Sequence, residues 1–242
     1  MESLRSKKIK NIVILTGAGI SAESGIQTFR ASDGLWENHR IEDVATPDGF
    51  RRNPSLVYKF YNERRKKLLS PEIAPNRAHF AITDLEQKFP GTVTTITQNV
   101  DDLHERSGTK NLLHMHGELL KMRCQKTGMI FEIKTDLISD SICSCCNQKN
   151  NLRPHIVWFN EMPLYMDKIE FELSYADLFL SIGTSGNVYP AAQFVSIAKK
   201  MNRAYCIEIN PQSTMVQNEF DELIRENATS ALPKLVEELL KI

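Results

Sequence analysis

The sequence predicts an α/β fold in which a doubly wound parallel sheet carries a smaller second domain. Two observations support this prediction: short apolar runs that each end in small or polar residues, and helical segments that lie between these runs. Short runs rich in Val, Ile, Leu and Thr are typical of strands buried on both faces of a parallel sheet. Strands that alternate with helices indicate an open α/β sheet.

The five apolar runs are expected to form the strands. They are residues 12–16, 93–97, 112–115, 178–182 and 205–209. The clusters that follow them are Gly17-Ala18-Gly19, Gln98-Asn99, His116-Gly117, Gly183-Thr184-Ser185 and Asn210-Pro211. Because ligands bind open α/β sheets beyond the carboxyl ends of the strands, we expect these clusters to line one site.

Helical patterns lie between the apolar runs. They cover residues 54–69, 75–88, 190–201, 213–226 and 232–241, with Pro54, Pro190 and Pro233 as start signals. Two stretches break the alternation, and we expect them to form the smaller domain. Residues 1–30, 91–117 and 158–242 would then form the sheet domain, residues 31–90 a helical insertion, and residues 118–157 a small insertion that holds the cysteines.

The composition favours a globular enzyme and excludes some partners. The chain has 242 residues, of which 41% are hydrophobic and 25% charged. Lys plus Arg and Asp plus Glu number 30 each, so no bulk charge attracts nucleic acid or an anionic membrane. No signal peptide or run of 18 apolar residues is present, and the expected location is cytoplasmic.

The glycine-rich segment at residues 17–22 fits the pattern G-x-G-x-x-[GA] directly after a strand. Such glycines allow a tight turn and a close approach of backbone N–H groups to a pyrophosphate, although a tight strand-to-helix turn alone would give the same pattern. A dehydrogenase would add a second strand ending in Asp or Glu about 20 residues on. The segment SDGLWENHRIEDVA contains no such strand, which weakens the dehydrogenase interpretation.

A longer set of motifs identifies a family. The string GAGISAESGIQTFR, followed by QNVD at 98–101, HG at 116–117, GTS at 183–185 and Asn210, resembles the sirtuin family. The resemblance covers essentially the whole chain, with the motifs in the family's order. It implies a Rossmann-like NAD-binding domain and an NAD-dependent protein-lysine deacylase, which transfers the acyl group to ADP-ribose and releases nicotinamide. Acyl-lysine proteins or peptides would be its substrates.

The resemblance also implies residue roles. His116 is the expected general base, with Asn99 as a second catalytic residue; on pattern alone His114, two residues earlier, could serve instead. Phe29 would shield the reactive C1′ of the nicotinamide ribose from water, and Asp101 would accept from the nicotinamide amide. The implied NAD-binding residues are Gly17, Ala18, Gly19, Ile20, Ala22, Phe29, Arg30, Trp36, Gln98, Asn99, Asp101, Gly183, Thr184, Ser185, Asn210 and Ala228.

Tyr61 and Arg64 lie three residues apart on a predicted helix and therefore on one face. A hydroxyl and a guanidinium together suit a carboxylate. With Ala45 giving room, the pair resembles the class III sirtuins, which act on succinyl- and malonyl-lysine as well as acetyl-lysine. The alternative is an ordinary exposed basic helix face. The family also pairs its substrate peptide with a strand that corresponds to Val157, Trp158 and Phe159, although Asn160 departs from the family's usual glycine.

Four of the five cysteines lie between residues 124 and 146, which suggests a metal site. Sirtuins usually carry two C-x-x-C pairs that bind structural zinc. Here Cys143 and Cys146 form the second pair, whereas the first is broken because Thr127 stands three residues after Cys124. One zinc ion held by Cys124, Cys143 and Cys146 is expected, and Cys145 could be the fourth ligand only if its loop is strained. Metal-free thiols are the alternative.

Two other functions remain open on the sequence. A mono-ADP-ribosyltransferase would use the same NAD site, and the cysteine segment could be a zinc ribbon that binds nucleic acid. The Tyr61–Arg64 pair argues against the first. The zero net charge and the broken first cysteine pair argue against the second, so neither membrane nor nucleic acid is an expected partner.

Overall fold

The computed structural model of the protein describes residues 8–27, 35–36 and 39–241. Its main element is a six-stranded sheet in the order β11-β10-β9-β1-β4-β5, in which all pairings are parallel. The strands are β1 (Asn11–Thr16), β4 (Thr92–Thr97), β5 (Leu112–His114), β9 (Leu178–Ile182), β10 (Tyr205–Ile209) and β11 (Glu222–Ile224). All five apolar runs form strands, which confirms the predicted fold class.

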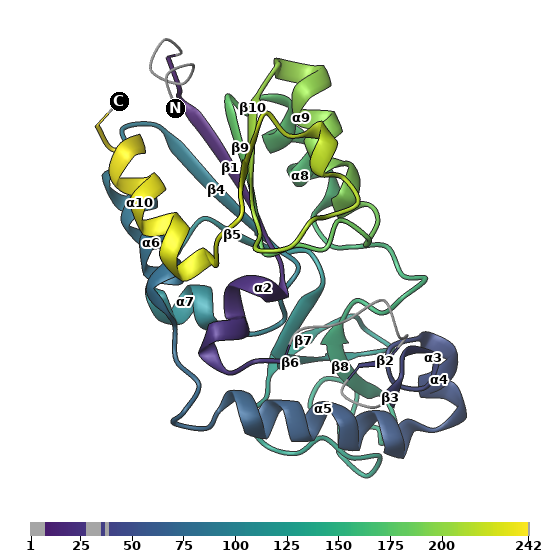
Figure 1. The fold of residues 1–242 in the computed structure, drawn as a ribbon. Coiled ribbons are helices and arrows are strands. Elements are labelled where there is room, and N and C mark those ends of the chain that lie inside the picture. The colour runs from purple at the N-terminus through teal and green to yellow at the C-terminus, as the bar shows by residue number, and fades with distance from the viewer. Residues whose placement is uncertain (1–7, 28–34, 37–38, 242) are drawn as a thin grey trace.

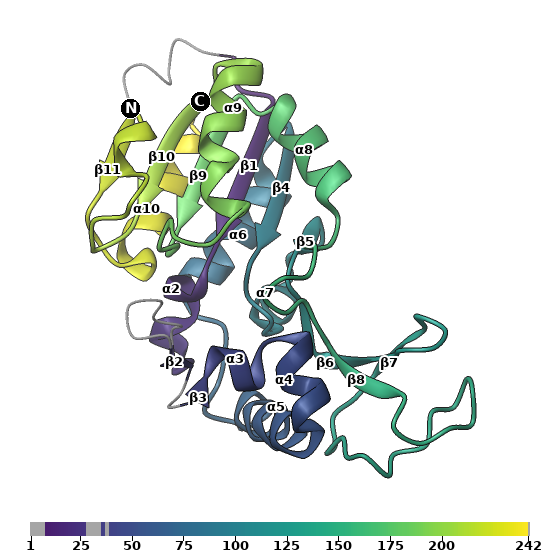
Figure 2. The ribbon, with the colours of Figure 1, turned by 90° about the vertical axis from the view of Figure 1, so that its right-hand side faces the viewer.

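Helices cover both faces of this sheet. α6 (Arg77–Lys88) and α10 (Ala228–Leu239) lie on one face, and α8 (Met166–Ser174) and α9 (Phe194–Asn202) lie on the other (Figures 1 and 2). Successive residues of β1 enter opposite cores, with Ile12 and Ile14 facing α6 and α10, and Val13 and Leu15 facing α8 and α9. This alternation requires apolar residues at every position, which is why the strand reads as a continuous apolar run.

The strand order reverses direction between β1 and β9, the two central strands. The chain steps outward from β1 through β4 to β5, and then returns to β9 before stepping through β10 to β11 on the other side. Open α/β sheets bind nucleotides beyond the carboxyl ends of the strands, at a point where the strand order switches in this way. The loops after β1 and β9 both begin at this point.

The second part of the molecule lies below the carboxyl end of the sheet in Figure 1. It combines α3 (Ile41–Val44), α4 (Pro47–Arg52) and α5 (Pro54–Leu68) with an antiparallel sheet of order β7-β6-β8. The strands of that sheet are β6 (Gly117–Cys124), β7 (Ile130–Glu132) and β8 (Leu152–Ile156), and a short pair, β2 (Leu35–Trp36) and β3 (His39–Arg40), lies nearby. These elements share a core of their own, separate from the two cores of the parallel sheet. The domain boundaries given above stay a prediction.

Local signals explain where the main helix of this part begins. The Asn53 side chain accepts a hydrogen bond from the Leu56 N–H at 3.1 Å, and Pro54 occupies the first helical position. Both features are typical of a helix start. α5 therefore begins at a defined residue, and this places Tyr61 in its third turn and Arg64 at the start of its fourth.

Three expectations about elements were wrong. Residues 213–226 form a short 3₁₀ turn, η3 (Gln217–Glu219), and the edge strand β11 instead of a helix. α8 was not expected, and Pro233 lies inside α10 instead of at its start. α10 continues through the proline because Leu232, Leu235 and Val236 around it are buried against the sheet, and this packing outweighs one missing backbone hydrogen bond. In the part of the chain that the structure describes, no helix is long and apolar enough to cross a membrane.

Candidate active site

The glycine loop after β1 packs directly against the loop after β9. A Cβ atom on Gly19 would lie 2.6 Å from the Cα atom of Gly183, and one on Gly17 would lie 2.7 Å from the Gly183 carbonyl oxygen. The Gly19 N–H donates to that same oxygen at 2.9 Å. Glycine is therefore required at both positions by a backbone crossing inside the protein, in addition to any approach to a pyrophosphate. Ile20 beneath the loop is fully buried, whereas Ala22 is exposed.

A buried polar network joins this loop to the end of β4. The Asn99 side-chain amide donates to the Gly17 carbonyl and to the Ser21 hydroxyl, both at 3.1 Å. The Ser21 hydroxyl in turn donates to the Asp101 carboxylate at 3.0 Å. Burial raises the pKa of Asp101 to about 6, against hydrogen bonds from the Leu103 N–H and from Ser21 that favour the charged form. Ser21 holds two predicted site residues together, and sequence reasoning did not single it out.

The histidines at the end of β5 and just after it have different hydrogen-bond partners. His114 Nδ1 donates to the Asn99 carbonyl at 3.1 Å, and its Nε2 lies 2.9 Å from a Glu105 carboxylate oxygen. Both partners are acceptors, so both ring nitrogens carry protons. Burial lowers the pKa of His114, but the hydrogen bond and the charge of Glu105 outweigh burial and raise it overall. A doubly protonated ring cannot act as a base.

His116 is arranged differently. Its Nδ1 donates to the Gln98 carbonyl at 3.1 Å, and a carbonyl can only accept, so the proton lies on Nδ1. Among the described residues Nε2 has no hydrogen-bond partner and keeps its lone pair. Burial lowers the pKa of His116 and outweighs the hydrogen bond to Gln98, which acts in the opposite direction. The lowered pKa keeps the ring neutral at pH 7. The geometry favours His116 over His114 as a base.

The loops after β9 and β10 are hydrogen-bonded to each other. The Asn210 side chain donates to the Thr184 carbonyl at 2.7 Å, and the Thr184 hydroxyl lies 2.9 Å from that of Ser181. Ala228 is buried at the start of α10, whereas Ser185 is exposed. The predicted residues that follow five strands thus gather at one edge of the sheet, where Gln98 is half-buried beside Asn99.

Tyr61 and Arg64 lie in the core of the second part of the molecule, on the side of α5 that faces β8. Tyr61 is fully buried and Arg64 is 8% exposed, whereas the following Lys66 and Lys67 are exposed. The Arg64 guanidinium lies 3.1 Å from the centre of the Phe60 ring and donates to the Phe60 carbonyl. An ordinary exposed helix face is therefore excluded for this pair. Ala45 is buried in the same core.

Known proteins resemble this chain in both sequence and fold. A sequence profile of the Sir2 family matches residues 17–190. An NAD-dependent protein deacylase of Vibrio vulnificus is 59% identical over 231 residues, which are 96% of this chain and 94% of the relative. Among solved structures, a Sir2 homologue in complex with NAD is 39% identical with a TM-score of 0.88, covering 100% of this chain and 94% of that one. The chain belongs to the Sir2 family.

A second solved structure bears on the substrate side. It is a Sir2 protein bound to a myristoylated histone peptide, 34% identical to this chain with a TM-score of 0.74, and the match covers 97% of this chain and 92% of that one. This Sir2 member therefore has structural relatives in complex with both a nucleotide and an acylated peptide.

The segment predicted to pair with a peptide leaves the end of β8. Val157 is half-buried, Trp158 is 2% exposed and Phe159 is 39% exposed, and the Phe159 N–H donates to the Ala45 carbonyl at 2.9 Å. Asn160, which replaces the usual glycine of the family, has a φ of 71°. Asn is the residue that adopts this left-handed conformation most readily after glycine. Asn160 therefore allows a left-handed turn at this position without a glycine.

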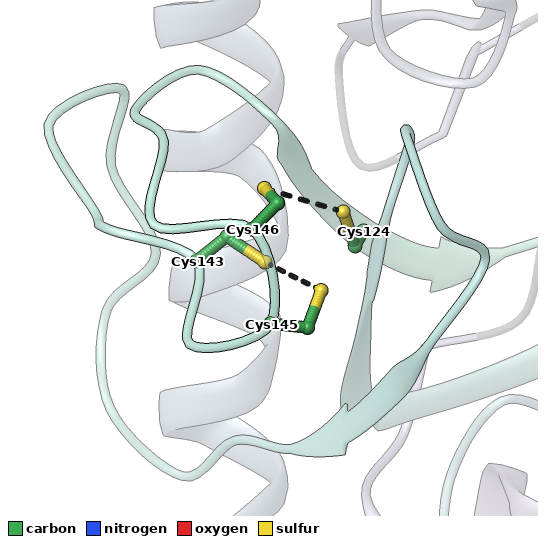
Figure 3. Close-up of side chains that lie close together, drawn as sticks. All are labelled: Cys124, Cys143, Cys145 and Cys146. Carbon is green, nitrogen blue, oxygen red and sulfur yellow. Dashed lines mark hydrogen bonds between the residues drawn. The ribbon is translucent and has the colours of Figure 1, made fainter.

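The cysteine cluster of this Sir2 member contains a fourth thiol. The Sγ atoms of Cys124, Cys143, Cys145 and Cys146 all lie within 4.8 Å of one another (Figure 3). The Cys124–Cys146 separation of 3.8 Å matches the edge of a tetrahedron with zinc–sulfur bonds of about 2.3 Å, whereas the Cys143–Cys145 separation of 3.2 Å is shorter than that edge. Cys145 Sγ lies 3.1 Å from the Thr127 hydroxyl, so it approaches the position where the first C-x-x-C pair lacks its second cysteine. The donor set fits structural zinc.

Some predicted residues fall outside the described part of the chain. Phe29 and Arg30 lie there, and for Trp36 the structure describes the backbone in β2 alone. Sequence reasoning also missed Arg153, a buried arginine on β8 that lies next to Trp158. The signal in the sequence is an arginine between Leu152 and Ile156. It becomes informative only when residues 152–156 are known to form a strand that is buried throughout.

Proposed function

We propose that this Sir2 member is an NAD-dependent protein-lysine deacylase that removes succinyl and malonyl groups in addition to acetyl. The observation that carries the proposal is the burial of the Tyr61 hydroxyl and the Arg64 guanidinium on one side of α5. A hydroxyl and a planar guanidinium on one face of a helix suit a carboxylate, and the acyl chains of succinyl- and malonyl-lysine end in one. Curated relatives named NAD-dependent protein deacylase support the general activity.

The chain's own groups would act at defined atoms. When bound, NAD supplies the ADP-ribose that receives the acyl group, and nicotinamide is released. His116 Nε2 would accept a proton from a ribose hydroxyl, and the Gln98 carbonyl holds the ring in the tautomer that this requires. Asn99 and Asp101 would bind the nicotinamide ribose and amide, while the Gly17–Gly19 and Gly183–Ser185 loops would bind the phosphates. Asn210 and Ala228 would contact the adenosine half.

The remaining predicted residues keep their roles as proposals. Phe29 would exclude water from the reacting carbon, and Arg30 and Trp36 would help to place the cofactor. Val157, Trp158 and Phe159 would pair with an extended substrate peptide, which is consistent with the acylated peptide bound by one relative. One structural zinc ion would be held by Cys124, Cys143 and Cys146 with Cys145. A cytoplasmic location stays a prediction that rests on the sequence.

Replacement of Arg64 by methionine tests the acyl specificity. The charged contact to a carboxylate is worth on the order of 2–3 kcal/mol, so we expect the succinyl-to-acetyl ratio of kcat/KM to fall roughly 30- to 150-fold. The assay uses acetyl-, malonyl- and succinyl-lysine peptides of one sequence with NAD, and masses identify the products. O-acyl-ADP-ribose is expected, whereas ADP-ribosylated protein would favour a transferase.

Lys67→Met is the matched control, because it removes an exposed positive charge from the same helix. Its acyl ratio should stay that of the unmodified protein. A loss of folding or of NAD binding lowers the activity toward all three peptides together and cancels in the ratio. An unchanged ratio in Arg64→Met would remove the basis for an acidic acyl pocket.

A further inference from the structure

Trp158 connects the peptide segment to the proposed acyl pocket. Its indole N–H donates to the Tyr61 hydroxyl oxygen at 2.9 Å, and both side chains are buried. An indole N–H can only donate, so the hydroxyl oxygen is the acceptor in this bond. A carboxylate can only accept, so a contact between Tyr61 and an acidic acyl group uses the hydroxyl proton. The two bonds run in the same direction, from indole to hydroxyl to carboxylate, and such chains strengthen each of their bonds.

The indole is itself held firmly. The Arg153 guanidinium lies 3.3 Å from the centre of the Trp158 ring, and Arg153 is 6% exposed. Phe50 packs against the same indole with ring centres 5.2 Å apart. A buried guanidinium stacked on an indole is a strong cation–π contact, which restricts rotation of the ring.

Glu161 completes the arrangement. Its carboxylate accepts two hydrogen bonds from the Arg153 guanidinium, at 2.7 and 3.0 Å, and a third from the Trp158 backbone N–H at 2.9 Å. The left-handed turn at Asn160 returns the chain so that Glu161 reaches both groups. The Arg123 guanidinium donates to the same carboxylate at 3.2 Å, so Glu161 is held by two arginines.

We propose that Trp158, held by Arg153 and Glu161, is a positioning residue that fixes the Tyr61 hydroxyl for contact with the carboxylate of an acidic acyl group. This inference rests on the proposed acyl pocket. Acetyl-lysine has no carboxylate to accept a hydrogen bond from Tyr61, so this contact contributes nothing to the turnover of acetyl-lysine. Trp158 therefore acts on the preference between acyl groups, a role distinct from its main-chain pairing with a peptide.

Trp158→Phe tests the inference, because it removes the N–H and keeps an aromatic ring. We expect the succinyl-to-acetyl ratio of kcat/KM to fall about fivefold, the typical effect of one neutral hydrogen bond. Tyr61→Phe should also lower the ratio. In the double variant, Trp158→Phe should cause no further fall, because the indole then has no hydroxyl to hold. A merely structural role would lower both activities together, or would lower the ratio independently of Tyr61; either result overturns the inference.

The failures of the two proposals are distinguishable. If neither Arg64→Met nor Tyr61→Phe changes the ratio, the acidic acyl pocket is wrong. If Tyr61→Phe lowers the ratio and Trp158→Phe does not, only the positioning role is wrong. Tyr58→Phe is the matched control, since Tyr58 lies on the same helix and its buried hydroxyl donates to the Leu152 carbonyl at 2.6 Å. It should leave the ratio unchanged.

Arg153→Lys provides a second variant in case Trp158→Phe unfolds. Lysine keeps the positive charge but lacks the flat guanidinium that stacks on the indole and binds Glu161 with two bonds. We expect the ratio to fall about two- to threefold, and this fall should also disappear in the Tyr61→Phe background. A parallel loss of both activities in a protein that still binds NAD would contradict the positioning role.

Discussion

His114 at the end of β5 and His116 just after it differ in their hydrogen bonds, and this difference decides their protonation. His114 has an acceptor at each ring nitrogen, whereas His116 has one acceptor, at Nδ1. The first ring is held as a cation and the second as a neutral base. Residue-level chemistry of this kind depends on which backbone carbonyls come within reach, and here both carbonyls belong to Gln98 and Asn99 at the end of β4.

His116→Ala should abolish turnover, with a loss of about 10²–10⁴-fold in kcat, because it removes the proposed base. NAD binding, measured by calorimetry, should change by only a modest factor, since the side chain is assigned no role in holding the nucleotide. Near wild-type turnover in the variant would place the base elsewhere. In the unmodified protein, the acid limb of the rate should lie below pH 6.5, because burial lowers the pKa of His116 from that value.

The buried charge of Asp101 is expected to lower the stability of the protein, although this residue is proposed to bind NAD. Its pKa in the folded protein is about 6, raised from 3.8 by burial, so the folded state binds the proton more tightly than the unfolded state. The charged carboxylate therefore lowers stability above pH 6, and this cost decreases as the pH falls toward 3.8. Asp101→Asn should raise the free energy of unfolding by on the order of 2 kcal/mol at pH 8, and by about half as much at pH 5.

Denaturant unfolding at the two pH values measures this difference. Asp84→Asn serves as the control, because Asp84 is an exposed carboxylate paired with Lys88 on the surface of α6. It should change stability little at either pH. A gain in Asp101→Asn that is equal at both pH values, or a loss, would argue against the cost of burying this charge.

At the scale of elements, we expect the stability of the segment between β6 and β8 to depend on its four clustered thiols. Cys124 and Cys143 are buried, and the segment contributes few large apolar side chains to the core around them. A small segment of this kind is commonly stabilised by a metal, whose binding free energy becomes folding free energy. Cys145 would supply the fourth sulfur of the proposed zinc site, although the C-x-x-C spacing does not include it.

Cys145→Ser should lower both the zinc content after a chelator challenge and the melting temperature, because a three-sulfur site holds zinc less tightly. Cys206→Ser is the control, since Cys206 is a buried cysteine of β10 that lies outside the cluster. Elemental analysis and thermal melting measure both variants. Absence of zinc from the unmodified protein would favour the metal-free thiols.

The elements differ in how well a sequence pattern predicts them. The strands of the parallel sheet are buried on both faces and therefore appear as continuous apolar runs. β11 escaped because it is an edge strand of three residues, in which Leu223 is exposed. β6 was not recognised because most of its residues are half-buried, so it lacks both the continuous run and a clean alternation.

At the scale of the whole molecule, the buried apolar side chains form three separate hydrophobic cores. Two lie on the faces of the parallel sheet, and the third joins α5 to the antiparallel sheet and the cysteine cluster. The proposed active site lies where the loops that follow β1 and β4 pack against this third core. The acyl pocket therefore belongs to a different core from the nucleotide crevice, and changes in one can be separated from changes in the other.

Removal of zinc tests this separation. A chelator should accelerate hydrogen exchange in residues 118–157 while leaving the strands of the parallel sheet protected, because the two regions have different cores. Thermal stability should fall, whereas NAD binding should persist. Exchange that accelerates equally in β1 and β6 would show that the molecule unfolds as one unit and that the cores are not independent.

The sequence alone determined the fold class, the family and the edge of the sheet at which the site lies, since these follow from local patterns: apolar runs, the glycine loop and ordered motifs. The tertiary structure alone decided which groups can react. Whether His114 or His116 is a base depends on carbonyls from another strand, and the burial of Tyr61 and Arg64 depends on β8 packing against α5. Spacing along a chain specifies which face of an element a residue occupies. What covers that face, and hence its charge state and its partners, comes from segments distant in sequence.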